Sequence, residues 1–188
     1  MIREAAAACR AGGPVVVGVT GPVGAGKSTL ATLLSTCVVR TDDYLPDHEE
    51  IAYLERDHPR HADVARLAAD LAALRAGRGI VVPVWSFQTH RREGTRALAS
   101  AGLIVCEGIH ALASGVRELV DVGVYVEANE ATRWERWAEL ERRGERGWGV
   151  ERAREYFDRV AEPTFAGFAA EYRGAARFLV VNEGGAES

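Results

Sequence analysis

The sequence predicts an α/β fold, a mostly parallel central sheet with helices on both faces. Three observations indicate this class. Short apolar runs of strand length recur along the 188 residues, stretches with helical spacing separate them, and a glycine-rich turn follows the first run. Strands that alternate with helices favour parallel pairing, and such sheets bind ligands at the carboxyl ends of their strands.

The elements follow from local patterns. Residues 15–20 (VVVGVT) form a continuous, largely β-branched apolar run, typical of a strand buried on both faces. Residues 61–76 carry apolar side chains at helical spacing, and Gly77 follows where a helix-ending glycine belongs. The other expected elements are a short N-terminal helix before 12–14, a helix from about 27, strands over 38–39, 79–85, 102–108, 121–127 and 177–182, and helices over 130–143 and 148–160.

Length and composition restrict the class of protein. A chain of 188 residues with 47% hydrophobic content predicts one domain over 1–188, with a tail over 183–188 that we expect to be disordered. The net charge of −4 gives no electrostatic reason to bind nucleic acid or an anionic membrane. No run approaches the about 18 apolar residues of a membrane span. Three widely spaced cysteines and a poor signal peptide predict a cytoplasmic protein, and a homo-oligomer remains open.

The glycine-rich turn predicts a phosphate site. Residues 21–28 (GPVGAGKS) match G-x-x-x-x-G-K-[ST], with a strand before and a helix after, as the P-loop NTPase fold requires. The backbone there can curl around phosphates at the positive end of a helix. We therefore expect ATP and Mg²⁺ as cofactors. An ordinary glycine-rich turn is the alternative. The expected nucleotide-binding residues are Gly21, Val23, Gly24, Ala25, Gly26, Lys27, Ser28 and Thr29.

Lys27 is the only lysine among the 23 lysine and arginine residues of the chain. A slim ammonium can reach phosphate oxygens inside a tight loop, whereas the wide guanidinium of arginine would displace it. We therefore assign Lys27 a catalytic role. With no second lysine, the N-K-x-D segment by which GTPases read guanine is absent. A small-molecule kinase or an unusual nucleotide-binding protein remains.

Acidic residues follow two of the expected strands. Asp42 and Asp43 come after 38–39, and either could orient or deprotonate an acceptor hydroxyl; a helix cap or a turn before Pro46 is the alternative. Glu107 ends an apolar strand, as the acid of a Walker B segment does. It would bind Mg²⁺ together with the hydroxyl of Ser28, unless its role is only structural.

These residues resemble the uridine kinase and phosphoribulokinase family of P-loop kinases, most closely its uridine–cytidine kinases. The resemblance runs in order over residues 15–181. The segments that carry it are TDDYLPD, RDHPRHAD, VPVWSFQTHRR, LIVCEGIHAL, DVGVYVEANEATRWERW and FDRVAEPTFAGF.

The resemblance implies roles for further residues. Asp42 corresponds to the acid that activates the acceptor hydroxyl, and Asp57 to the acid that binds ribose hydroxyls. Aromatic rings near a strand end could stack on a planar base, although ordinary core packing is the alternative for them. The expected substrate-binding residues are Asp43, Asp57, Trp85, Phe87, His90 and Arg91.

An arginine-bearing lid is expected over about 133–149. Arg133 and Arg136 share one helix face, and cations on a mobile element could stabilise charge on a transferring phosphoryl group. We predict catalytic roles for both. The alternative is a solvated helix with glutamate–arginine pairs. Arg142, Arg143 and Arg146 surround two glycines, and their roles stay open.

The chain departs from the resembled family around the acceptor. Leu45 and Trp85 stand where uridine kinases usually carry tyrosine, and Ser86 replaces an aspartate. The leading hypothesis is an ATP-dependent kinase that phosphorylates a hydroxyl of a nucleoside such as uridine or cytidine. The alternatives are a sugar phosphate, pantothenate, glycerate or nicotinamide riboside as acceptor, or a non-catalytic nucleotide sensor.

Overall fold

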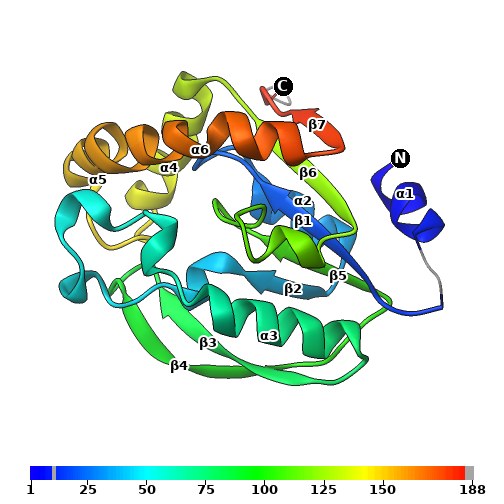
Figure 1. Ribbon diagram of the computed structural model, residues 1–188. Coiled ribbons are helices and arrows are strands. Elements are labelled where there is room, and N and C mark those ends of the chain that lie inside the picture. Colours follow the sequence, from blue (N-terminus) through cyan, green and yellow to red (C-terminus); the bar gives the residue numbers. More distant parts are fainter. Residues whose placement is uncertain (10–11, 185–188) are drawn as a thin grey trace.

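The computed structural model describes residues 1–9 and 12–184 and has an α/β architecture (Figure 1). Five parallel strands form the central sheet in the order β2-β5-β1-β6-β7. The expected mostly parallel sheet is thereby confirmed. The strands are β1 Val15–Thr20, β2 Cys37–Arg40, β5 Leu103–Glu107, β6 Val122–Glu127 and β7 Phe178–Val181.

Helices cover both faces of this sheet. Successive side chains of a strand point to opposite faces, and every residue of β1 is buried, so both faces need a cover. Val17 and Val19 of β1 pack on the face covered by α1 (Ile2–Ala8) and α2 (Lys27–Leu34). Val16 packs on the opposite face with Leu67 and Leu71 of α3 (Val64–Arg75). The last helix, α6 (Glu162–Ala175), lies on the face of α3, where its aromatic side chains contact Tyr125 of β6. No helix of the described residues is both long and apolar enough to span a membrane.

The strand expected over 79–85 forms outside the central sheet. It is β3 (Ile80–Ser86), which pairs antiparallel with β4 (Arg91–Leu98) in a two-stranded ribbon that projects beside β2 and α3 (Figure 1). β4 was not expected from the sequence, because its residues RREGTRAL are mostly exposed and lack apolar alternation. The ribbon carries Trp85 and Phe87 toward the carboxyl end of the central sheet.

The C-terminal helical region is longer than the sequence indicates. After α4 (Glu130–Arg142), α5 (Val150–Tyr156) continues through a π-helical stretch over Phe157–Ala161 into α6. Pro163 suggests a helix boundary in sequence, but it lies in the first turn of α6, where a missing backbone N–H is tolerated. The expected disordered tail over 183–188 lies mostly outside the described residues.

Gly108 sits where β5 leaves the sheet and illustrates how tightly this edge is packed. Its φ is +141°, and a Cβ there would overlap the Oγ1 atom of Thr41. Thr41 is itself buried at the end of β2. A side chain at position 108 would therefore strain the backbone and push the ends of β2 and β5 apart.

We predict that Gly108→Ala lowers the free energy of unfolding by about 3 kcal/mol, from backbone strain and overpacking together. Chemical denaturation of the purified chain measures the change. Gly94→Ala is the matched control, because position 94 has no neighbour within 4 Å and no left-handed φ; we expect a change below about 0.5 kcal/mol. Equal effects of the two substitutions would contradict the packing argument.

Candidate active site

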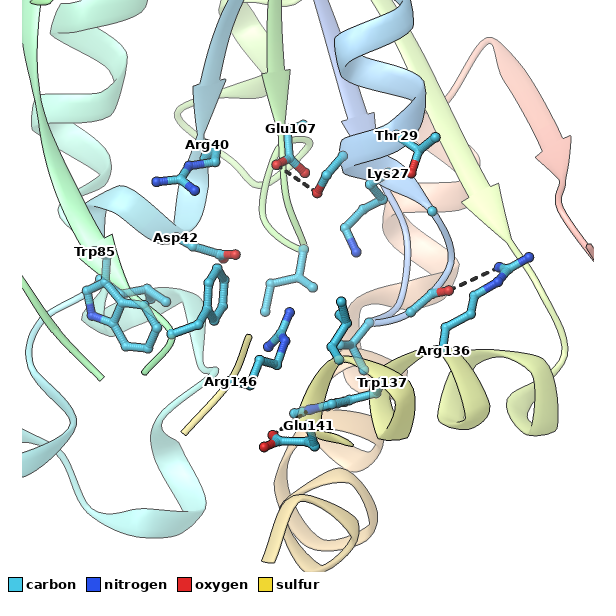
Figure 2. Close-up of a pocket in the computed structure, with 18 of the residues that line it drawn as sticks. Lys27, Thr29, Arg40, Asp42, Trp85, Glu107, Arg136, Trp137, Glu141 and Arg146 are labelled. Atoms are coloured by element: carbon cyan, nitrogen blue, oxygen red, sulfur yellow. Dashed lines mark hydrogen bonds between the residues drawn. The ribbon is translucent and has the colours of Figure 1, made fainter. Parts of the chain in front are cut away.

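The carboxyl ends of three neighbouring strands build the site. β1 leads into the glycine-rich turn, β2 into Asp42, and β5 ends at Glu107. The register pairs Glu107 with Val19 on one side and with Arg40 on the other. Since the strands are parallel and adjacent, their carboxyl ends open onto one pocket of about 1380 Å³, lined by residues of all three segments. Figure 2 shows Asp42, Lys27 and Glu107 pointing into this shared space.

Three glycines shape the phosphate loop. Gly21, Gly24 and Gly26 have φ values of +147°, +74° and +97°, which are backbone conformations that side chains disfavour. A Cβ at each would overlap Val126 O, Arg133 O or the Asn182 side chain, respectively. The loop is thus pressed against β6, α4 and the segment after β7. Only glycine permits so close an approach, which explains the spacing of the motif.

Side chains outside the loop hold its carbonyl groups. Arg133 Nη1 donates to Val23 O (3.3 Å), Arg136 Nη1 donates to Gly24 O (3.1 Å; Figure 2), and Asn182 Nδ2 donates to Ala25 O (2.9 Å). These bonds occupy carbonyl oxygens along the outer side of the loop. They favour a conformation in which backbone N–H groups are available to an anion within it.

Arg133 does not face the pocket, as a lid residue that contacts phosphate would. Its guanidinium is buried in a bidentate ion pair with Glu162, and it is not among the residues that line the pocket. Arg136 reaches the pocket wall, yet its donors go to Gly24 and Asn182. In this structure both arginines brace the phosphate loop, because α4 packs directly against it. Their predicted catalytic roles stay predictions.

Lys27 is buried at the centre of the loop. Its Nζ donates to Pro22 O at 2.8 Å, and burial lowers its pKa, an effect that the nearby carboxylates of Glu107 and Asp42 oppose. In this arrangement Lys27 is a compact cation beneath the cradle, flanked by two acids. Arginine could not occupy the same volume without displacing the loop.

Ser28 and Glu107 supply oxygen donors for a divalent cation. Ser28 Oγ donates to Glu107 Oε1 at 3.1 Å, and Glu107 is 4% exposed. Burial, together with the charge of Asp42, raises the pKa of Glu107 to about 7. A hydroxyl and a carboxylate in contact fit Mg²⁺, which takes few protein ligands and completes its shell with water and phosphate oxygens. The two residues would hold the ion that neutralises phosphate charge.

Asp42 and Asp43 diverge, as adjacent side chains must. Asp42 lines the pocket, and burial raises its pKa although Lys27 and Arg146 lower it. Asp43 is fully buried and accepts hydrogen bonds from Arg40 Nε (3.1 Å) and from the backbone N–H of Trp85 (3.2 Å). Asp43 thus joins β2 to the ribbon, which leaves Asp42 as the acid of the pair that faces the pocket.

Aromatic side chains line the opposite end of the pocket. Trp85, Phe87 and His90, expected from the sequence, all line it. The indole Nε1 of Trp85 donates to Pro46 O at 3.3 Å, so the ring presents carbon atoms to the cavity. The ring of His90 stacks on that of Trp148 with centroids 4.2 Å apart and planes 4° from parallel. Four further rings of this wall were not expected from the sequence: His48, Trp137, Trp148 and Tyr156.

Asp57 lines the same pocket at the foot of this wall. Its Oδ1 accepts a hydrogen bond from the hydroxyl of Tyr156 at 2.7 Å, and its backbone O contacts His110 Nε2 at 2.7 Å. Burial raises the pKa of Asp57 to about 6, although the bond from Tyr156 favours the charged form. The motif RDHP thus supplies a carboxylate to the pocket. The hydroxyl of Tyr156 on α5, about 100 residues away in sequence, holds that carboxylate by its hydrogen bond.

Arg146 is the cation of the expected lid that lies among the aromatic rings of the pocket. Arg146 lies in the loop between α4 and α5, its guanidinium 4.1 Å from the ring centroid of Phe87 and 5.1 Å from that of Trp137. Burial lowers its pKa, an effect opposed by Asp42, Glu141 and Asp57. Figure 2 shows Arg146 pointing from the lid toward Asp42. The flanking glycines were the sequence signal for it.

The lid loop is attached to the ribbon and to α4. Gly147 N donates to Phe87 O (3.2 Å), and Gln88 Nε2 donates to Gly144 O (2.8 Å). Buried Glu141 accepts from the backbone N–H groups of Trp148 and Gly149. These bonds hold Trp148 and Arg146 over the pocket.

Arg91, expected to bind substrate, is directed elsewhere. It is exposed, pairs with Glu49, and does not line the pocket. Its neighbour Arg92 donates from Nε to Leu45 O at 2.8 Å and from its backbone N–H to Asp47. The ribbon turn at His90, with φ +58°, sets these directions.

The raised pKa of Asp57 predicts a pH-dependent stability. The folded pKa of about 6 exceeds the unfolded value of about 3.9. The folded state therefore binds more protons, and stability falls as pH rises from about 4 to about 6. Asp57→Asn should remove this fall. Between about pH 4 and about pH 6, the free energy of unfolding of the variant should therefore rise by up to about 3 kcal/mol relative to that of the unmodified chain. Urea denaturation at pH 4 to 7 tests it; parallel curves for the two chains would contradict the assignment.

Comparison with known proteins places this geometry in a family. The profile of the Phosphoribulokinase / Uridine kinase family matches residues 42–171. A uridine kinase of Streptococcus equi subsp. zooepidemicus is 28% identical over 169 residues, which cover 82% of this chain and 81% of that protein. A structure described as a possible uridine kinase from Bacillus stearothermophilus superposes with a TM-score of 0.69 at 18% identity, covering 94% of each chain.

A relative with another described activity also matches part of this chain. The inorganic pyrophosphatase TTM2 of Arabidopsis thaliana is 36% identical over 121 residues, or 61% of this chain, but the match spans only 18% of that longer protein. The chain also spans slightly less than two thirds of several matched clostridial uridine kinases. Since the family profile covers well over half of the chain and the fold agrees with it, this chain belongs to the phosphoribulokinase and uridine kinase family of P-loop kinases.

Proposed function

We propose that the chain is an ATP-dependent kinase that phosphorylates a hydroxyl group of a nucleoside-like small molecule. One observation carries the proposal. Asp42 lies in a single pocket that has the phosphate loop at one end and, at the other, a wall of aromatic rings with Asp57 beside it. A phosphate-binding loop alone fits many activities. A carboxylate between such a loop and a ring-lined cavity fits transfer of a phosphoryl group to a bound hydroxyl compound.

Asp42 has the position and charge of the general base. Its raised pKa makes it a stronger proton acceptor than an exposed aspartate, since burial disfavours the carboxylate. Lys27, Arg146 and Arg40 act against this effect, so the acid need not stay protonated. In the proposed role, Asp42 orients the acceptor hydroxyl and takes its proton.

Cations surround the place where negative charge would gather. Lys27 lies beneath the loop and Arg146 faces it from the lid, so the two approach from opposite sides. ATP with Mg²⁺, when bound, would supply the phosphoryl group and the ion that shields its charge. Ser28 and Glu107 would hold that ion, while Lys27 and Arg146 stabilise the equatorial oxygens.

The aromatic wall supports a planar group on the acceptor. Trp85, Phe87 and His90 present ring surfaces, and Asp57 offers a carboxylate that can accept hydrogen bonds from sugar hydroxyls. These features favour a nucleoside over an aliphatic acceptor such as glycerate. They also favour a catalyst over a nucleotide sensor, because a sensor has no use for a ring-lined extension of the pocket beside the phosphate site.

Asp42→Asn should lower kcat by about 10²- to 10⁴-fold, because general-base catalysis contributes factors of this size. The amide keeps the shape of the side chain, so nucleotide affinity should stay within about twofold. The assay follows ADP release with Mg-ATP and a panel of nucleosides, with products identified by mass. Glu50→Gln, at an exposed acid nearby, is the control.

Two results would contradict the proposal. A near-normal rate for Asp42→Asn would move the base to another residue. An unmodified chain whose ADP release responds to no acceptor in the panel, including sugar phosphates, pantothenate and glycerate, would favour the nucleotide sensor.

Arg146→Met should lower kcat by at least about 10²-fold with little change in the KM for acceptor, since its cation would act mainly on transition-state charge. Methionine retains much of the contact with Phe87 and Trp137. The matched variant is Arg142→Met, whose exposed guanidinium pairs with Glu135 and Glu139 and, unlike that of Arg146, does not line the pocket. A loss of equal size in both variants would show that the lid needs charge in general rather than Arg146.

A further inference from the structure

We infer that His48 is a specificity-determining residue, whose imidazole recognises the hydrogen-bonding edge of an uncharged planar ring on the acceptor. The inference rests on the proposed acceptor side of the pocket and extends it. His48 lies in none of the sequence segments from which the site was predicted. It begins a short 3₁₀ turn over His48–Glu50, directly after the TDDYLPD segment.

The first observation is an unsatisfied nitrogen. His48 lines the pocket and is only 7% exposed, and its enclosed Nδ1 atom has no hydrogen-bond partner among the described residues. A buried polar atom without a partner costs about 1–3 kcal/mol. An unpaired polar atom at a pocket wall indicates that its side chain binds a ligand rather than stabilises the fold.

Neighbouring polar groups show the same feature. Four enclosed side-chain polar atoms of the described residues lack a partner, and three of them belong to His48, Tyr53 and Arg56. Tyr53 contacts the ring of Tyr156 edge-on at 5.7 Å, and the Arg56 guanidinium lies 5.2 Å from the Tyr53 ring. Tyr53 and Arg56 do not line the pocket, so His48 Nδ1 is the atom of this set that belongs to a pocket-lining residue.

The ring of His48 is central among the aromatic side chains. Its centroid lies 5.0 Å from those of Trp85 and His90, 5.7 Å from Trp148 and 6.0 Å from Tyr156. Its plane is within 30° of parallel to the last three of these rings. A planar group that stacks in this cluster would meet the edge of His48, where a ring nitrogen can donate or accept.

Trp148 shows how a flat ring sits in this cluster. Its backbone N–H donates to Glu141, and its indole stacks on His90 with centroids 4.2 Å apart, so this surface accepts a flat ring. The indole centroid is also 5.7 Å from that of His48, so a planar group at this end of the pocket lies close to the imidazole.

The charge around the cluster selects an uncharged ring. Three guanidinium groups lie against it: Arg146 over Phe87, Arg152 over Trp148 at 5.6 Å, and Arg56 over Tyr53. Burial above all, and then the charges of Arg56, His90 and Arg152, lower the pKa of His48 to about 3, so its imidazole stays neutral. The same field opposes a cationic ring such as the pyridinium of nicotinamide riboside. A neutral nucleobase is both planar and uncharged, as this end of the pocket requires.

The experiment measures binding rather than turnover. Calorimetric titration of the full chain, in the presence of Mg-ADP, uses uridine, cytidine, adenosine and guanosine, with ribose and nicotinamide riboside as comparators. We expect at least one neutral nucleoside to bind more tightly than both comparators. His48→Phe, which keeps a ring but no nitrogen, should raise the Kd of that nucleoside at least tenfold. His48→Asn, which places an amide near Nδ1, should recover much of the affinity.

Thermal unfolding without nucleoside distinguishes recognition from a structural role. Because His48→Phe removes an unsatisfied polar atom, the melting temperature of the variant should be unchanged or higher by a few degrees. A lower melting temperature with an unchanged Kd would overturn the inference, as would an unmodified chain that binds no nucleoside or prefers nicotinamide riboside. Nucleoside binding that depends on His48 without any ATP turnover would instead overturn the proposed kinase function alone.

Discussion

The parallel pairing of β2, β5 and β1 is the constraint on which the site depends. It directs the glycine-rich turn, Asp42 and Glu107 to one edge of the sheet, although Ser28 at the end of the turn and Glu107 are 79 positions apart in sequence. Buried apolar side chains on both faces hold the three strands in register. The chemistry of the site therefore derives from ordinary sheet packing, with polar residues confined to positions where strands end.

Buried charges at this edge depend on one another. Burial disfavours the charged forms of Lys27, Asp42 and Glu107 alike, while the attraction between unlike charges restores them. The loop is fixed from outside by Arg133, Arg136 and Asn182, so its carbonyl groups are satisfied without ligand. The site is thereby preorganised on the phosphate side, where the fold supplies every partner.

The acceptor side is built differently. Its rings come from the segment after β2, the ribbon and the lid, which are not strands of the central sheet. His48 Nδ1 there lacks a partner, and hydrogen bonds between loops, such as Gln88 Nε2 to Gly144 O, join the lid to the ribbon. Rigid phosphate binding combined with an acceptor wall of loops agrees with a family in which the common chemistry is fixed and the acceptor varies.

The sheet, the phosphate loop and the family could be predicted from the sequence, because they depend on local patterns: apolar runs, glycine spacing and acids that follow strands. The sequence also indicated Trp85, Phe87, His90 and Asp57, all of which line the pocket. Long-range contacts determine which of two adjacent aspartates lines the pocket and place Arg146 among its aromatic rings. They also bring His48, Trp148 and Tyr156 together. These outcomes depend on contacts between distant segments, such as the bond of Asp43 to Trp85 and the packing of α4 on the loop, and no local pattern in the sequence encodes them.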